Sequence, residues 1–196
     1  DQIEAGSYMV AAAITGGNVL IKNVIPKHLE PITAKMELAG VTVEEYDDSI
    51  RVCRTGDLMP LKIRTMPHPG FPTDMQPLMT VLLTTAKGTS IVTEGIWENR
   101  FRYVDELVRM GANIQVDGQV AVIEGVPELQ PAPLRASDLR AGAALVMAAL
   151  SAKGTSEVSE IAHIERGYED LVEKLQGLGA DIRRVEKPAA GLPQAL

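Results

Sequence analysis

The chain has 196 residues, 45% of them hydrophobic and 23% charged, and a formal net charge of −7 at pH 7. This composition is that of a globular protein that can bury one sizeable core, and the negative charge argues against broad binding to nucleic acid or to acidic membranes. The longest apolar run, residues 141–150, is too short to span a bilayer, and a single cysteine, Cys53, excludes an internal disulfide framework and fits a reducing cytoplasm. Because Cys53 alternates with apolar neighbours, we predict that it is structural, in a short strand, rather than a nucleophile.

Two kinds of glycine recur three times along the chain. Glycines of the first kind close a helix rich in Ala, Leu or Val and precede a Val/Ile/Thr-rich run, so we interpret them as left-handed helix C-caps: Gly16-Gly17, Gly88 and Gly154. Glycines of the second kind close the amphipathic segment that follows: Gly40, Gly111 and Gly179. The intervals from 17 to 40, 88 to 111 and 154 to 179 are 23, 23 and 25 residues, which indicates a threefold repeat.

Each repeat predicts helix, strand, helix, strand, and residues 49–54 and 119–124 add a further strand to the first two repeats. The third repeat runs out after Arg184. A pseudo-threefold arrangement would gather equivalent helix ends at one pole of a single α/β domain. We therefore predict one domain over residues 1–186, with repeats of about 1–66, 67–136 and 137–186, and a frayed tail or artificial end over 187–196. The first residue is Asp and helical sequence begins almost at once, so we expect this to be part of a longer chain.

One carboxylate lies between a proline-rich loop and the first helix of the second repeat. Prolines keep the approach extended, so Thr73 or Asp74 is a natural N-cap of the helix that follows. Asp74 lies fourteen residues before Gly88, as Arg140 lies fourteen residues before Gly154. The spacing predicts that Asp74 and Arg140 meet at the same end of equivalent helices.

Three arginines begin or precede helices. Asp138 is the better cap of its helix, so Arg140 places a cation at the positive end of the helix dipole, which is favourable only if an anion binds there. Arg100 and Arg166 precede or open the second helices of their repeats. Together with Asp74 they indicate a site for a multiply charged phosphate or carboxylate. Simpler interpretations stay open: a plain cap for Asp74, a salt bridge from Arg140 to Asp138 or a neighbour, and solvated surface charges for the others.

Other kinds of site find little support. The three histidines, at 28, 68 and 163, have no metal-ligand spacing, and the chain has no nucleotide-binding Gly-rich loop and no nucleophile elbow. We expect no metal and no cofactor.

Four motifs, together with the repeat, resemble the bacterial UDP-N-acetylglucosamine enolpyruvyl transferases of the EPSP synthase superfamily. They occur in the family's order, and the likeness covers nearly the whole chain: Phe71-Pro72-Thr73-Asp74-Met75-Gln76, Glu98-Asn99-Arg100-Phe101, Asp138-Leu139-Arg140-Ala141 and Ile164-Glu165-Arg166-Gly167-Tyr168-Glu169. The resemblance implies a two-domain enzyme of roughly double this length, with the active site between two inside-out α/β barrel domains of three repeated units each. This chain resembles the domain built mainly from the C-terminal half.

The resemblance also implies roles on the sugar side of the site. Asp74 corresponds to an aspartate that contacts the sugar 3-hydroxyl and is proposed to take its proton, and Ile96 corresponds to a position that binds the UDP-sugar through its backbone. In the implied reaction the hydroxyl adds to C2 of phosphoenolpyruvate while C3 is protonated, and phosphate then leaves the tetrahedral adduct.

On the phosphoenolpyruvate side, the resemblance implies that Arg140 and Arg166 hold that substrate, that Arg100 lies near it, and that Asp138 orients a basic group beside them. The family's catalytic cysteine loop, which Cys53 does not match, and most of its uridine contacts belong to the other half. We therefore expect the isolated chain to fold without turning over substrate. The implied partners are the two substrates and the other half of the enzyme, with neither nucleic acid nor membrane, in the cytoplasm.

Two alternatives remain. The enolpyruvylshikimate-phosphate synthases share the fold and the phosphoenolpyruvate chemistry, although the loop from His68 to Asp74 favours the sugar-nucleotide branch. A non-catalytic repeat scaffold that binds a partner protein is the alternative from a different class.

Overall fold

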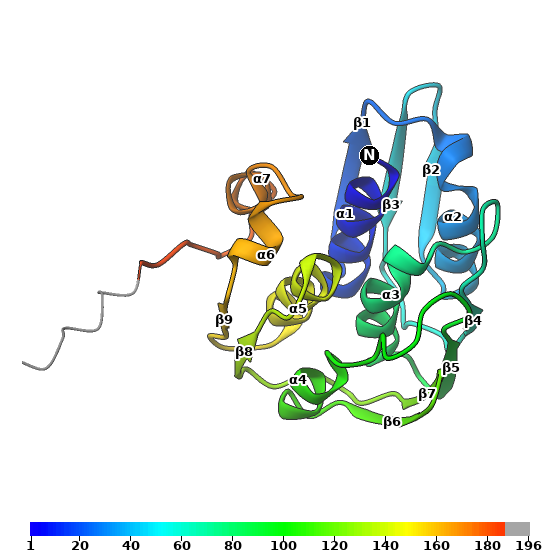
Figure 1. Cartoon of the computed structure of the whole chain (residues 1–196). Coiled ribbons are helices and arrows are strands. Elements are labelled where there is room, and N and C mark those ends of the chain that lie inside the picture. The colour runs from blue at the N-terminus through cyan, green and yellow to red at the C-terminus, as the bar shows by residue number, and fades with distance from the viewer. Residues whose placement is uncertain (187–196) are drawn as a thin grey trace, which may run out of the picture.

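A computed structural model describes residues 1–186, so the tail predicted over 187–196 lies outside the described residues. Three helices contact one another in the middle of the molecule (Figure 1): α1 (Gln2–Thr15), α3 (Gln76–Leu83) and α5 (Leu139–Ser151). Most of their residues are buried. Because the helices carry apolar or small side chains on nearly every side, packing at the centre of the core stabilises them.

Three sheets surround these helices (Figure 1). The first is antiparallel, in the order β1 (Asn18–Lys22), β3 (Ser49–Cys53) and β2 (Thr42–Glu45). In the second, β4 (Lys62–Arg64) pairs parallel with β5 (Thr89–Thr93), and β7 (Val120–Glu124) and β6 (Asn113–Asp117) continue it antiparallel. In the third, β8 (Pro133–Arg135) pairs parallel with β9 (Glu157–Ser159). The predicted α/β class is confirmed; within residues 1–186 the strands form separate sheets, not one closed barrel.

The shorter helices lie between the strands in sequence. They are η1 (Pro26–Leu29), α2 (Glu30–Leu38), η2 (Thr73–Met75), α4 (Val104–Arg109), α6 (Ala162–Glu165) and α7 (Leu171–Gly177). No helix in the described part of the chain is long and apolar enough to cross a membrane.

The helices α2, α4 and α7 end in the same hydrogen-bonding motif. Each is followed by a glycine with positive φ, of 88° at Gly40, 86° at Gly111 and 96° at Gly179. The residue after each glycine donates its N–H to a carbonyl five residues back, at 3.0 Å in all three cases: Val41 to Met36, Ala112 to Leu107 and Ala180 to Leu175. This is the Schellman motif, which needs a left-handed residue before the donor. Its recurrence confirms the repeat inferred from the second kind of glycine.

The glycines of the first kind are not equivalent. Gly16 is the left-handed C-cap of α1, with φ 69° and ψ 30°, as predicted. The C-cap prediction is wrong for Gly88 and Gly154. Helix α3 ends at Leu83 with Thr84 as its C-cap, and α5 ends at Ser151 with Ala152 as its C-cap. The φ values of Gly88 and Gly154 are 136° and 122°. At both positions the chain passes a proline ring so closely that a Cβ would lie 3.0 Å from Pro60 Cγ and 2.9 Å from Pro131 Cγ. Close approach therefore accounts for these two glycines.

Some strands were missed and one was predicted wrongly. Strands β4 and β8 have only three residues each, too few for an alternating pattern to reveal them. The strand expected after Gly179 does not form, and residues 180–186 have no regular structure. In the first two repeats the equivalent strands, β2 and β6, pair with β3 and β7, and the described part of the third repeat has no such partner. Cys53 is half-buried at the end of β3, so its predicted place in a short strand is confirmed.

Candidate functional site

The starts of the three central helices meet at one pole. Asp1 caps α1 by accepting the Ile3 N–H at 2.8 Å. Asp74 lies in η2, which leads directly into α3. Arg140 lies in the first turn of α5, and its Nε is 3.5 Å from Asp74 Oδ2, while its Nη2 is 3.9 Å from Asp1 Oδ2. The meeting of Asp74 and Arg140, predicted from the fourteen-residue spacing, is confirmed.

Asp74 lies between two arginines. Arg100 Nη2 donates to Asp74 Oδ1 at 3.0 Å, on the opposite oxygen from the one that faces Arg140. The two arginine side chains are 22% and 15% exposed, whereas the Asp74 side chain is 41% exposed. The Asp74 carboxylate is therefore partly open to solvent, although each of its oxygens faces a largely buried guanidinium group.

The predicted N-cap role of Thr73 or Asp74 is wrong. Neither η2 nor α3 begins with a side-chain cap. Pro77 stands in the first turn of α3 and has no N–H to be capped, which lowers the demand for a capping oxygen. The Asp74 carboxylate, which bonds instead to the stronger charged donors of the arginines, is thus free of the helix backbone.

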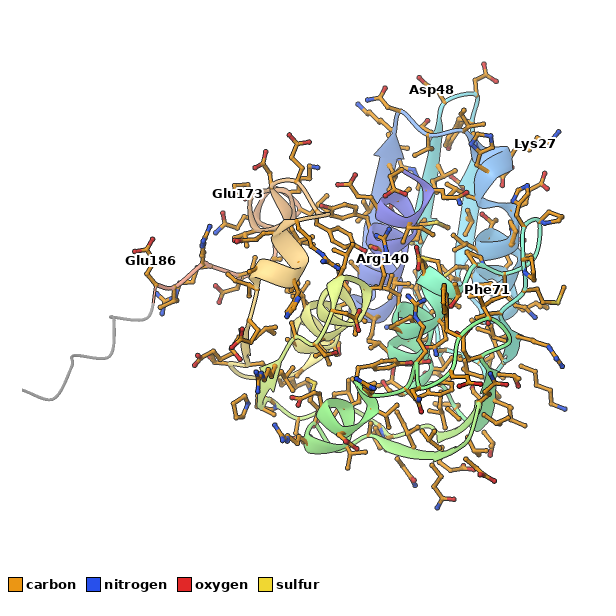
Figure 2. All side chains as sticks on the ribbon, viewed as in Figure 1. Lys27, Asp48, Phe71, Arg140, Glu173 and Glu186 are labelled. Carbon is orange, nitrogen blue, oxygen red and sulfur yellow. The ribbon has the colours of Figure 1, made fainter. Side chains whose placement is uncertain are left out.

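The Arg140 guanidinium is oriented by a buried chain of hydroxyl groups. Arg140 Nη1 donates to the Tyr168 hydroxyl at 3.3 Å, and the guanidinium carbon lies 5.6 Å from the centre of the Tyr168 ring. The Tyr168 hydroxyl is 2.6 Å from Ser7 Oγ, whose own proton goes to the Ile3 carbonyl at 2.8 Å. Tyr168 therefore donates to Ser7 and accepts from Arg140. Figure 2 shows Arg140 in the central part of the molecule, where these helices meet.

The suggested salt bridge from Arg140 is present, but with Asp74 and Asp1 rather than with Asp138. Asp138 instead caps α5, accepting the Ala141 N–H at 2.9 Å, as predicted. The Asp138 carboxylate therefore points at the start of α5, next to Arg140 in the first turn of that helix.

A buried glutamate that sequence reasoning missed lies behind the cluster. Glu94 is 1% exposed and follows β5 directly. Its carboxylate accepts hydrogen bonds from the Thr65 and Thr73 hydroxyls at 2.7 and 3.0 Å, and from the Ile96 and Trp97 N–H groups at 3.0 and 3.3 Å. The available signal was an acidic residue placed directly after a Val/Ile/Thr run and before a glycine, where a solvated charge is the usual interpretation.

The backbone of Arg100 has its own support. Gln76, which is fully buried, donates from Nε2 to the Arg100 carbonyl at 3.4 Å and accepts from the Tyr103 hydroxyl. Burial above all raises the pKa of Tyr103 well above its ordinary value, so this hydroxyl stays protonated and acts as a donor.

The remaining predicted residues lie beside the cluster. Ile96 gives its N–H to Glu94, and no group in residues 1–186 donates to its carbonyl, which is left for another partner. Arg166 is exposed at the end of α6, and no group in the described residues pairs with its side chain. The structure thus joins Asp74, Arg100 and Arg140 directly but leaves Arg166 two residues from Tyr168, outside the ion-pair cluster. The described residues contain no group of three or more His, Cys, Asp or Glu that could hold a metal ion.

The fold and the site together define a class of protein: an α/β domain whose central helices begin side by side at a cluster of charged side chains. The chain belongs to the EPSP synthase (3-phosphoshikimate 1-carboxyvinyltransferase) family, whose model matches residues 1–175. Within it, the chain is 59% identical over 187 residues to the UDP-N-acetylglucosamine 1-carboxyvinyltransferase 3 of Caldanaerobacter subterraneus subsp. tengcongensis, covering 95% of this chain and 45% of that protein. It is 56% identical over 185 residues to the UDP-N-acetylglucosamine 1-carboxyvinyltransferase of Clostridium botulinum, covering 94% and 44%. The family resemblance of the motifs is confirmed.

Solved structures support the same assignment. The enolpyruvyl transferase NikO from Streptomyces tendae superposes with a TM-score of 0.86 at 33% identity, over 93% of this chain and 44% of that one. An EPSP synthase from Acinetobacter baumannii gives a TM-score of 0.74 at 18% identity, which supports the fold alone. This chain spans about half the length of the two curated relatives named above.

Proposed function

We propose that this chain is one domain of a cytoplasmic transferase that moves the enolpyruvyl group of phosphoenolpyruvate to the 3-hydroxyl of UDP-N-acetylglucosamine, with release of phosphate, in the first committed step of peptidoglycan precursor synthesis. The observation that carries the proposal is the Asp74 carboxylate held between Arg100 and Arg140 where the helix starts meet. The names of relatives at 50–59% identity support the choice of sugar nucleotide.

The arginines form the anion-binding part of the site. Arg140 stands at the start of α5, where free N–H groups and the helix dipole favour a negative charge. A phosphate or carboxylate that enters can share Arg140 and Arg100 with Asp74, and Arg166 is free to add a third guanidinium. Such fixed cations stabilise charge that develops on phosphate as it leaves.

Asp74 faces the hydroxyl. Its exposed side can accept a hydrogen bond from the sugar 3-hydroxyl, which aligns the oxygen for attack on C2 of phosphoenolpyruvate. The oxygen–C2 bond forms as C3 gains a proton and the hydroxyl loses one; the C2–O bond to phosphate then breaks and C3 gives up a proton. We assign the group that protonates C3 to the other half of the enzyme. The Ile96 carbonyl, to which no group in residues 1–186 donates, would bind the sugar nucleotide, and Asp138 would orient a basic group near Arg140.

A second candidate reaction has an observation in its favour. The matching family model describes 3-phosphoshikimate 1-carboxyvinyltransferase, so shikimate 3-phosphate is the rival acceptor. The chemistry at phosphoenolpyruvate is the same in both reactions. The acceptor alone separates them.

A chimera tests the proposal, in which this chain replaces the matching 45% of the Caldanaerobacter relative. Phosphate release is measured with phosphoenolpyruvate and either UDP-N-acetylglucosamine or shikimate 3-phosphate, and folding is checked by circular dichroism. We expect turnover with the sugar nucleotide only, and its loss on Arg140→Met. Turnover with shikimate 3-phosphate only, or none from a folded chimera, would overturn the proposal and favour the sibling enzyme or a scaffold.

The isolated chain provides a separate test. We expect no turnover from the purified 196-residue chain, because the cluster supplies an anion site and a hydroxyl acceptor but no described donor for C3. Product formed by this chain alone would contradict the division of the active site between two halves.

A further inference from the structure

Glu94 is the only acidic or basic residue of the buried class in residues 1–186. Its hydrogen bonds come from uncharged donors, and no arginine, lysine or histidine in that part of the chain lies within ion-pair distance of it. Burying a carboxylate without a cation costs free energy that hydrogen bonds must offset. The hydrogen bonds of Glu94 must therefore account for the presence of an acidic residue at this buried position.

The carboxylate of Glu94 is met by donors only. Two hydroxyls and two backbone N–H groups point at it, which suits a group that can accept but not donate. Thr65 Oγ1 also accepts the Gly95 N–H at 2.7 Å, so its own proton is directed to Glu94. All four donors reach Oε1 of Glu94, and Thr73 Oγ1 also lies 3.1 Å from Oε2. A glutamine that keeps its oxygen at the Oε1 position would therefore turn its NH₂ group toward Thr73 alone.

Glu94 joins three segments that carry the site. Thr65 follows β4, Thr73 begins η2 next to Asp74, and Ile96 and Trp97 form the loop after β5. A single buried side chain thus ties the loop that carries Asp74 to the loop that carries the free Ile96 carbonyl.

The hydroxyl of Thr73 links Glu94 to Arg100. Because its proton goes to Glu94, its lone pairs face outward, and Arg100 Nη1 donates to it at 3.2 Å. The same guanidinium reaches Asp74 through Nη2 at 3.0 Å. The polarity that Glu94 imposes on Thr73 is what makes Thr73 an acceptor for Arg100.

We propose that Glu94 is a positioning residue of the transferase: through Thr73 it sets the Arg100 guanidinium against Asp74, and through two N–H groups it holds the Ile96–Trp97 loop. The inference rests on the proposed function, since it gives Glu94 a part in arranging groups that bind the substrates. The hydrogen bonds of Glu94 go to Thr65, Thr73, Ile96 and Trp97, and no hydrogen bond or ion pair joins it to Arg100, Arg140 or Asp74.

The first test needs no activity and uses the 196-residue chain. Glu94→Ala and Glu94→Gln are compared with Ser90→Ala, a matched control in β5, the strand that precedes Glu94; Ser90 is fully buried and accepts the Leu61 N–H at 3.1 Å. We expect Glu94→Ala, which removes the shared acceptor, to raise amide exchange at Ile96 and Trp97 by roughly tenfold or more. In a crystal structure, the NH₂ group of Glu94→Gln should donate to Thr73 in place of Arg100 and so break the Thr73–Arg100 contact. Ser90→Ala should do neither. Wild-type exchange in Glu94→Ala, or an intact Thr73–Arg100 contact in Glu94→Gln, would overturn the inference.

The second test measures kinetics in the chimera well below its unfolding temperature. We expect Glu94→Gln to lower kcat/KM by about 10- to 100-fold, since small misplacements of binding groups have effects of that order. Thr73→Val should lower kcat/KM by a similar factor, whereas Thr73→Ser, which keeps the hydroxyl, should keep the wild-type kcat/KM. The Glu94→Gln/Thr73→Val double variant should lose no more kcat/KM than the more impaired of the two single variants. Strictly additive losses, or an equal loss in Ser90→Ala, would assign Glu94 a merely structural role.

The outcomes separate this inference from the function on which it rests. If the wild-type chimera is folded but inactive, the proposed function fails and the exchange and crystal measurements still decide whether Glu94 sets Arg100 and the loop. If Glu94→Ala does not fold, Glu94→Gln and Thr73→Val still decide, by crystal structure and kinetics, whether Thr73 sets Arg100.

Discussion

Replacing Asp74 with asparagine should remove activity while leaving the domain folded. The substitution keeps one oxygen, which can still accept from Arg100, and replaces the other with an NH₂ group that faces Arg140. Because Asp74 makes no bond to the helix backbone, the start of α3 should be unaffected.

The effect on stability follows from exposure. The two ion pairs span 3.0 and 3.5 Å, but the Asp74 side chain is 41% exposed, so solvent screens both interactions. Such pairs contribute up to about 1 kcal/mol each, and with one hydrogen bond retained we expect a loss of about 1 kcal/mol in the free energy of unfolding. For a chain of this length that lowers Tm by about 2–4 °C.

The effect on catalysis should be larger. Loss of a group that takes up or directs a proton lowers kcat by about 10²- to 10⁴-fold. The assay is phosphate release by the chimera with saturating phosphoenolpyruvate and UDP-N-acetylglucosamine, alongside thermal unfolding. Asp57→Asn is the matched control, since Asp57 pairs with Lys87 at 2.7 Å, away from the helix starts, and should change neither kcat nor Tm appreciably. A kcat for Asp74→Asn within about threefold of wild type, or a Tm loss above about 10 °C, would refute this account of Asp74.

Three further predictions concern the surroundings of the cluster. Tyr168→Phe removes the acceptor of Arg140 and should cost about 1–2 kcal/mol and raise KM for phosphoenolpyruvate, measured by thermal unfolding and kinetics; an unchanged KM would remove Tyr168 from the site. Gly142→Ala would place a Cβ 2.7 Å from Ile164 Cγ1 and should destabilise by about 1–3 kcal/mol in denaturant unfolding, whereas Gly177→Ala meets open space and should be neutral or stabilising; equal effects would contradict the packing described here. Arg166→Met should leave Tm unchanged, since the side chain has no partner in the described residues, yet raise KM for phosphoenolpyruvate about tenfold or more; a normal KM would exclude Arg166 from the anion site.

Local chemistry made parts of the site predictable. A helix start is marked by its own sequence, so Asp138 as a cap and Arg140 in the first turn followed from residues next to one another. The repeat then related positions far apart in the chain, because equal spacing within equivalent units puts residues at equivalent places. Asp74 and Arg140 met for that reason, 66 residues apart in sequence.

Other features depended on competition that no local pattern reveals. Thr73 and Asp74 have ordinary capping side chains, yet neither caps, because charged and buried partners from distant segments bind them instead. Gly88 and Gly154 resemble helix C-caps, yet a neighbouring proline ring explains them. The three-residue strand β4 pairs with the longer strand β5, and β8 pairs with the equally short β9, so the partner strand and not a local pattern defines each of them.

The sequence by itself determined the repeat, the α/β class and the helix starts that carry Asp74 and Arg140, since all of these depend on spacing and local propensity. Only the tertiary structure decided that Arg100 and Arg140 bind opposite oxygens of Asp74, that no group in residues 1–186 pairs with Arg166, and that a buried Glu94 connects Thr73 to the Ile96–Trp97 loop. The physical reason is that the partner of a charged or hydroxyl side chain is set by which donors and acceptors the fold brings within about 3 Å of it, and residues from several distant segments share that space.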